Sequence, residues 1–120
     1  MMTRKNNLIA ERSMTFAVRI VGLYRYLTGR KRETVMSKQL LRSGTSIGAN
    51  VREGLYAQSR KDFISKLNIA LKEAGETDYW LDVIHSAGYF TNQEFDSLKA
   101  DNDELLRLLT AIIKSTKERE

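Results

Sequence analysis

The chain has 120 residues, with 20 Lys or Arg, 15 Asp or Glu, one His, no Cys and no Pro. This length suits one domain, and an apolar fraction of 42% with 29% charged residues is typical of globular proteins rather than disordered or membrane-spanning ones. The absence of cysteine excludes a disulfide scaffold, a cysteine-ligated zinc site and a thiol nucleophile. No apolar segment approaches the roughly 20 residues that a bilayer requires, and no export signal follows the basic first residues. We therefore expect a cytoplasmic protein with no membrane role.

The first half of the chain predicts two helices, because apolar residues recur there with a period of about 3.6 residues. The first helix should run over residues 7–28, and Gly29 is placed to end it. The run Arg30-Lys31-Arg32 should then form a solvated corner. The second helix should cover residues 34–57.

The second half predicts two more helices, over residues 60–88 and 92–117. Ser59 is placed to cap the third helix, and Thr91 with Glu94 has the composition and spacing of a capping box for the fourth. Four helices joined by short connections are most simply arranged as an up-and-down antiparallel four-helix bundle. We thus expect an all-α fold, with residues 1–120 forming a single domain.

Two glycines on the second helix, Gly44 and Gly48, stack on one side because they are four residues apart. Each lowers helix propensity by up to about 1 kcal/mol relative to alanine, so their presence indicates close packing of another backbone. A nucleotide-binding loop is excluded here, because the glycine spacing is too short and no strand or Lys-Ser/Thr pair accompanies it.

The third helix carries an apolar stripe besides the one that should face the core. It comprises Ile69, Trp80 and Val83, with Tyr79 at its edge. Two interpretations remain open, since the fourth helix could cover the stripe or a second copy of the chain could bind there. A stripe centred on tryptophan is typical of interfaces, so we favour self-association.

Several polar residues fall at or beside the predicted core stripes, and most should form structural hydrogen bonds. Asp78 and His85 share a face and could reach one water or one partner group. As a metal site they supply two ligands where at least three are usual, and as a catalytic pair they lack a placed nucleophile. We therefore expect no metal, no cofactor and no enzymatic activity. The other polar positions are Ser43, Asn50 and Asn102.

The basic residues concentrate in the first half of the chain. Residues 1–60 carry 12 basic and 3 acidic side chains, a net charge of +9, whereas residues 61–120 carry 8 and 12, a net charge of −4. Arg12, Arg19 and Arg30 fall within about 40° of one another on a shoulder of the first helix. Such a surface suits a polyanion, although arginine clusters are also common on ordinary soluble surfaces. The candidate nucleic-acid-binding residues are Arg12, Arg19, Arg30, Lys31, Arg32, Arg42 and Arg52.

Two runs carry a resemblance to a known family. Residues 39–54, Gln-Leu-Leu-Arg-Ser-Gly-Thr-Ser-Ile-Gly-Ala-Asn-Val-Arg-Glu-Gly, are similar to the signature of the bacterial four helix bundle protein family, and so are residues 59–63, Ser-Arg-Lys-Asp-Phe, with 67–74. That family is also called the 23S ribosomal RNA intervening-sequence protein family, and it includes the accessory variability protein of diversity-generating retroelements. The resemblance implies a homopentamer, with a basic surface used in the retroelement members for nucleic acid and a reverse transcriptase.

The resemblance also implies architectural roles for the residues at signature positions. Asp62 would cap the third helix, and Gly54 would end or kink the second. The signature positions are Arg42, Ser43, Ser46, Asn50, Glu53, Gly54, Asp62 and Phe63.

The expected function is that of a non-enzymatic, oligomeric accessory protein that binds the backbone of RNA or DNA, assisting a reverse transcriptase or associated with ribosomal RNA. Because aromatic side chains are not interleaved with the basic residues, recognition of structured RNA by shape and charge is the expected form. The alternative is a protein-interaction scaffold whose acidic half docks a basic partner. A difference in salt dependence separates the two hypotheses.

Overall fold

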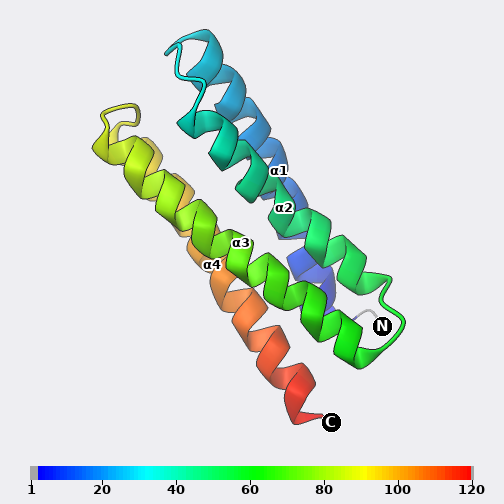
Figure 1. Cartoon of the computed structure of the whole chain (residues 1–120). Helices are drawn as coiled ribbons and strands as arrows, with labels where there is room; N and C mark the ends of the chain where they lie inside the picture. Colours follow the sequence, from blue (N-terminus) through cyan, green and yellow to red (C-terminus); the bar gives the residue numbers. More distant parts are fainter. Residues whose placement is uncertain (1–2, 120) are drawn as a thin grey trace.

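The computed structural model describes residues 3–119; Met1, Met2 and Glu120, which the expected domain includes, lie outside that range. These residues form four helices and no strand: α1 (Arg4–Gly29), α2 (Met36–Leu55), α3 (Arg60–Ser86) and α4 (Asn92–Glu118). Figure 1 shows the α1–α2 and α3–α4 turns at one end of the bundle, and the two chain ends with the α2–α3 turn at the other. The predicted up-and-down four-helix bundle is confirmed.

The core lies along the bundle axis and is built from aliphatic side chains of all four helices. Ile20, Ile47, Leu81 and Leu109 are fully buried. Each such side chain contributes about 1.5–3 kcal/mol relative to its exposed state. Helices α1 and α3 each pack against α2 and α4 and lie across the bundle diagonal from one another. Within residues 3–119, no helix combines the length and apolarity needed to cross a bilayer.

Three helices begin at a side-chain cap. The first starts at Arg4, three residues before the predicted start, because the Thr3 hydroxyl accepts the Asn6 N–H at 3.0 Å. For α3 the Ser59 hydroxyl accepts the Asp62 N–H at 3.0 Å, so Ser59 is the cap and Asp62 lies in the first turn. The predicted capping box at Thr91 and Glu94 is present on α4.

The second helix is shorter than predicted, because a glutamate folds back over its start. Glu33 is buried, and its carboxylate accepts the N–H groups of Val35 and Met36 at 3.0 Å and of Ser37 at 2.7 Å. Helix α2 therefore begins at Met36 instead of residue 34. Burial by itself raises the pKa of Glu33, but these backbone hydrogen bonds outweigh it and hold the pKa below the ordinary value.

In the α1–α2 turn, a residue other than glycine adopts left-handed backbone dihedral angles. Gly29 is the last residue of α1 and not a left-handed cap; Arg30 follows it as the C-cap with φ −90°. The positive φ in this turn falls on Arg32, at 59°. In the α3–α4 turn, by contrast, Gly88 has φ 89°, which lets the N–H groups of Gly88 and Tyr89 bond to carbonyls in the last turn of α3.

The glycines of α2 face neighbouring helices at close range. A Cβ on Gly44 would lie 3.0 Å from the Ile20 side chain, and one on Gly48 would lie 3.2 Å from the Ser13 carbonyl oxygen. Helices α1 and α2 therefore pack so closely that alanine at either position would require its neighbour on α1 to shift by a few tenths of an ångström. Gly54 is the last residue but one of α2, which ends at Leu55.

Small polar side chains lie inside the core and join helices. Thr77 of α3 donates to the Ser43 hydroxyl of α2 at 3.0 Å, and Asn102 of α4 donates to the Ala74 carbonyl of α3 at 2.9 Å. Asn102 is fully buried, and its Oδ1 has no partner within residues 3–119. Because an unsatisfied buried polar atom is costly, Asn102 favours the one register in which its amide meets Ala74.

Glu33 should make α2 sensitive to acid. A carboxylate with a lowered pKa in the folded state contributes stability above its unfolded pKa and loses it as pH falls through the folded value. We expect Glu33→Gln to lower the free energy of unfolding at pH 7 by about 1 kcal/mol, as loss of a helix cap does. This deficit should shrink towards pH 3, as measured by urea denaturation followed by circular dichroism. Glu11→Gln, at an exposed α1 position, is the control. A deficit that stays constant with pH would contradict this role of the Glu33 charge.

Candidate nucleic-acid interface

The two arginines on the shoulder of α1 are engaged by carboxylates of α4. Arg12 forms an ion pair with Glu104, and Arg19 donates to Asp101 at 2.6 Å and to the Ser97 hydroxyl at 2.9 Å. These contacts join two helices that the sequence separates by about 80 residues or more. Arg12 and Arg19 therefore bridge the flank of the bundle instead of presenting free guanidinium groups.

Arg42 is engaged in the same way between α2 and α3. Its guanidinium pairs with Glu76 and, at 3.4 Å, with Glu73. The hydrogen bond to Glu76 is the largest cause that raises the pKa of Arg42, and it correspondingly lowers the pKa of Glu76. Arg12, Arg19 and Arg42, which the sequence predicts as nucleic-acid-binding residues, are thus already paired with carboxylates from the acidic half of the chain.

The remaining predicted cations separate into two places. Arg30, Lys31 and Arg32 lie together in the α1–α2 turn, and within residues 3–119 none of them forms an ion pair. Arg52 likewise forms no ion pair in the described part of the chain, but it lies about 24 Å away along α2, counted from Met36. We call the cluster at the turn the basic corner; its members are Arg25, Arg30, Lys31, Arg32 and Lys38, all exposed.

The basic corner has a fixed backbone and an aromatic side chain. Glu33, the carboxylate within the turn, is buried and bonded to the start of α2, and within residues 3–119 it forms no ion pair with the cations around it. Lys31 Nζ lies 5.9 Å from the centre of the Tyr26 ring, and Tyr26 is 38% exposed. One aromatic ring therefore accompanies the basic residues of this corner, and this ring could stack against an unpaired base.

The predicted interface on α3 is only partly exposed. Ile69 and Tyr79 are 39% and 58% exposed, whereas Trp80 and Val83 are half-buried. Trp80 packs against the core, its Nε1 donates to Glu76 at 3.4 Å, and its ring meets the edge of Tyr79 at 5.0 Å. The exposed part of this stripe, Ile69 and Tyr79, is the α3 face.

A second apolar face, on α1, was missed by the sequence analysis. Met14 is 52% exposed, Val18 61% and Val21 37%. Their spacing of four and three residues places them on one side of the helix, away from the core stripe, and this spacing was the available signal. We call them the α1 face. Beside them lies a groove of about 390 Å³ between α1 and α2, lined by small side chains that include Ala10, Ala17 and Ala49.

The other signature residues have local roles. Gly54 faces α3, where a Cβ would come within 2.8 Å of the Leu67 side chain, so its function is close approach. Asn50 donates to the Ser46 carbonyl one turn earlier at 2.8 Å. Phe63 is half-buried and packs against the core. The capping role expected of Asp62 belongs to Ser59, as described above.

Asp78 and His85 do not share a partner. Asp78 forms an ion pair with Lys99 of α4, whereas His85 hydrogen-bonds to Asn92 at 2.8 Å and stacks on the Phe95 ring with 3.9 Å between centroids. Both therefore join α3 to α4. In the described part of the chain, no three His, Cys, Asp or Glu side chains form a cluster that could hold a metal ion.

The left-handed backbone of Arg32 has a measurable consequence. A non-glycine residue in this region costs about 1 kcal/mol, so we expect Arg32→Gly to keep or raise the free energy of unfolding, by up to about 1 kcal/mol. Arg30→Gly, at a right-handed position in the same turn, should lower it by about 0.5–1 kcal/mol. Urea denaturation of both variants measures the two free energies of unfolding to be compared. Destabilisation by Arg32→Gly would show that the arginine side chain itself supports the turn.

Comparison with known proteins shows to which family the chain belongs. The family model of the 23S rRNA-intervening sequence protein matches residues 5–111. The crystal structure of a protein of unknown function from the S23 ribosomal protein family of Bacteroides thetaiotaomicron VPI-5482 is 55% identical, with a TM-score of 0.91, over 92% of this chain and 98% of that chain. No curated protein matches the chain. The chain belongs to the 23S rRNA-intervening sequence protein family.

Proposed function

We propose that this protein is a non-enzymatic, self-associating protein that binds the backbone of RNA or DNA through the basic corner. The observation that carries the proposal is a group of five exposed cations that form no ion pair within residues 3–119 and lie in or beside a turn whose carboxylate, Glu33, is buried and bonded. Phosphate groups are the partners that such a cluster suits, because guanidinium and ammonium groups release condensed counterions when they bind a polyanion.

Two further observations support a nucleic acid as the ligand. The mid-bundle arginines pair with carboxylates, whereas no cation of the basic corner forms an ion pair within residues 3–119. The family to which the chain belongs is named after an intervening sequence of 23S rRNA. The proposed ligand is a structured RNA. The sequence resemblance implies two settings for it, in which the protein assists a reverse transcriptase or is associated with ribosomal RNA.

The alternative of an acidic docking scaffold loses support. Six carboxylates of the acidic half, which that hypothesis requires to be free, pair with Arg12, Arg19, Arg42 and Lys99. These six carboxylates are therefore already paired, which leaves less free acidic charge for a basic partner.

Neutralising the basic corner should weaken RNA binding. We expect the triple variant Arg30→Gln, Lys31→Gln, Arg32→Gln to bind an RNA hairpin at least tenfold more weakly at about 0.1 M salt. The slope of log K against log salt should also fall by about 2–3. Filter retention over a salt series measures both quantities.

The matched control removes the same charge from α4, as Arg107→Gln, Lys114→Gln, Lys117→Gln; all three positions are exposed. Arg12→Gln with Arg19→Gln should reduce stability more than binding, because those side chains bridge helices. Equal losses in the corner triple and the α4 triple would contradict a localised site, and no binding by the wild type would contradict the function.

Self-association is proposed from the two apolar faces. The α1 face and the α3 face lie on helices that are diagonal in the bundle, so one copy can offer its α3 face to the α1 face of the next. The groove of small side chains beside Met14 suits the projecting Tyr79 ring. A head-to-tail contact of this kind closes into a ring when the rotation between copies permits, and the sequence resemblance implies five copies.

Mixing two single variants tests the head-to-tail contact. Val18→Glu and Tyr79→Glu should each give monomers in light scattering, because a buried unpaired carboxylate is costly and both side chains are exposed in the free chain. Mixed together, they should form a dimer, since one variant keeps an intact α3 face and the other an intact α1 face. Arg107→Glu is the exposed control. A mixture that stays monomeric, or a variant that keeps the wild-type mass, would contradict this arrangement.

A further inference from the structure

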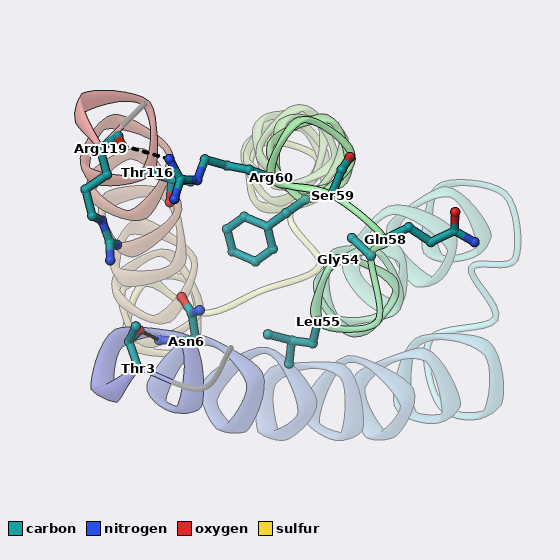
Figure 2. A pocket seen from close by; sticks show the side chains of 11 residues that line it. Thr3, Asn6, Gly54, Leu55, Gln58, Ser59, Arg60, Thr116 and Arg119 are labelled. Carbon is teal, nitrogen blue, oxygen red and sulfur yellow. Dashed lines mark hydrogen bonds between the residues drawn. The ribbon is translucent and has the colours of Figure 1, made fainter.

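A cavity of about 340 Å³ opens at the end of the bundle opposite the basic corner (Figures 1 and 2). All four helices contribute to it: α1 begins there with Thr3 and Asn6, α2 ends with Gly54 and Leu55, α3 starts beside Ser59, and α4 ends near Thr116. Its volume lies at the lower end of the range of about 300–1,000 Å³ for small-molecule sites.

The lining has one apolar part and one charged part. Leu55, Ala57 and Phe63 supply apolar surface, and Gly54 adds no side chain. Arg60 and Arg119 supply positive charge, and among residues 3–119 no Asp or Glu lines the cavity. A ligand with an apolar body and an anionic head would match both parts.

The two guanidinium groups differ from those of the mid-bundle arginines. Arg60 Nη1 donates to the Arg119 carbonyl oxygen at 2.8 Å, which holds the side chain across the space between α3 and α4 (Figure 2). Arg119 Nε donates to the Ser115 carbonyl at 3.4 Å. Within residues 3–119 neither group pairs with a carboxylate, so both keep their positive charge and terminal N–H donors for a ligand.

We infer that this cavity binds a small amphiphilic anion, a carboxylate or phosphate monoester that carries an aromatic ring or a branched chain. The anionic head lies between Arg60 and Arg119, and the apolar body rests against Phe63 and Leu55. The inference goes beyond the proposed function, because this site and the basic corner occupy opposite ends of the bundle and bind different classes of ligand.

Four probe compounds, compared at constant ionic strength, separate the contributions of the anionic head and of the aromatic ring to the binding affinity. Phenyl phosphate and phenylacetate carry both head and ring, inorganic phosphate carries the head alone, and benzyl alcohol carries the ring alone. We expect saturable amide shifts in ¹H–¹⁵N spectra, confined to the residues around the cavity, for the first two compounds. Phenyl phosphate should bind at least about tenfold more tightly than inorganic phosphate, because its ring leaves water.

Single variants identify the charged residues. Arg60→Gln should weaken phenyl phosphate binding about tenfold, as loss of a charged hydrogen-bond donor does. Arg119→Gln should weaken phenyl phosphate binding severalfold. Because this variant retains the backbone carbonyl that Arg60 contacts, its loss of affinity is not explained by local unfolding, as the effect of Arg60→Gln could be. Arg25→Gln, in the basic corner, should leave the affinity unchanged.

Three results would overturn the inference. The first is equal affinity for phenyl phosphate and inorganic phosphate, since it would mean that charge alone binds. The second is an Arg60→Gln affinity equal to that of Arg25→Gln. The third is a set of amide shifts that lies in the basic corner instead of around the cavity. RNA binding by Arg60→Gln and Arg119→Gln is expected to be unchanged, so failure here is distinguishable from failure of the proposed function.

Discussion

The antiparallel packing of a basic hairpin, α1 and α2, against an acidic hairpin, α3 and α4, decides which charges this protein can offer to a ligand. Along the flanks, the packing brings Arg12 and Arg19 to α4 carboxylates and Arg42 to α3 carboxylates. Each exposed pair contributes little to stability, about 0–1 kcal/mol. Their main consequence is for function, because they pair the mid-bundle cations with carboxylates, whereas the cations of the basic corner and of the end cavity form no ion pair within residues 3–119.

The flank contacts depend on a register that the core sets. Gly44 and Gly48 bring α1 close to α2, Ser43 bonds to Thr77 across α2 and α3, and Asn102 meets the Ala74 carbonyl across α3 and α4. A slip of one helical turn would separate the Asn102 amide from its acceptor inside the core. Polar groups and glycines thus specify the alignment, whereas the aliphatic side chains supply most of the stabilising free energy.

The two ends of the bundle have different chemistry because the turns that close them differ. The basic corner is a short turn held by the Glu33 carboxylate, with Arg32 in a left-handed conformation that glycine would adopt more readily. At the other end, the start of α3 and the end of α4 hold Arg60 and Arg119 over a cavity with apolar lining. A polyanion suits the first, where charge projects into solvent, and a small anion suits the second, where charge borders a recess.

The sequence by itself determined the helices, their number, the caps at Ser59 and Thr91 and the family, because periodicity, capping and signature residues are local properties of the chain. It also indicated an excess of positive charge in the first half. Only the tertiary structure decided which arginines are free, since an ion pair such as Arg19 with Asp101 joins residues 82 positions apart. The α1 face and the end cavity were likewise decided there, because solvent exposure and enclosure depend on which helices lie alongside one another.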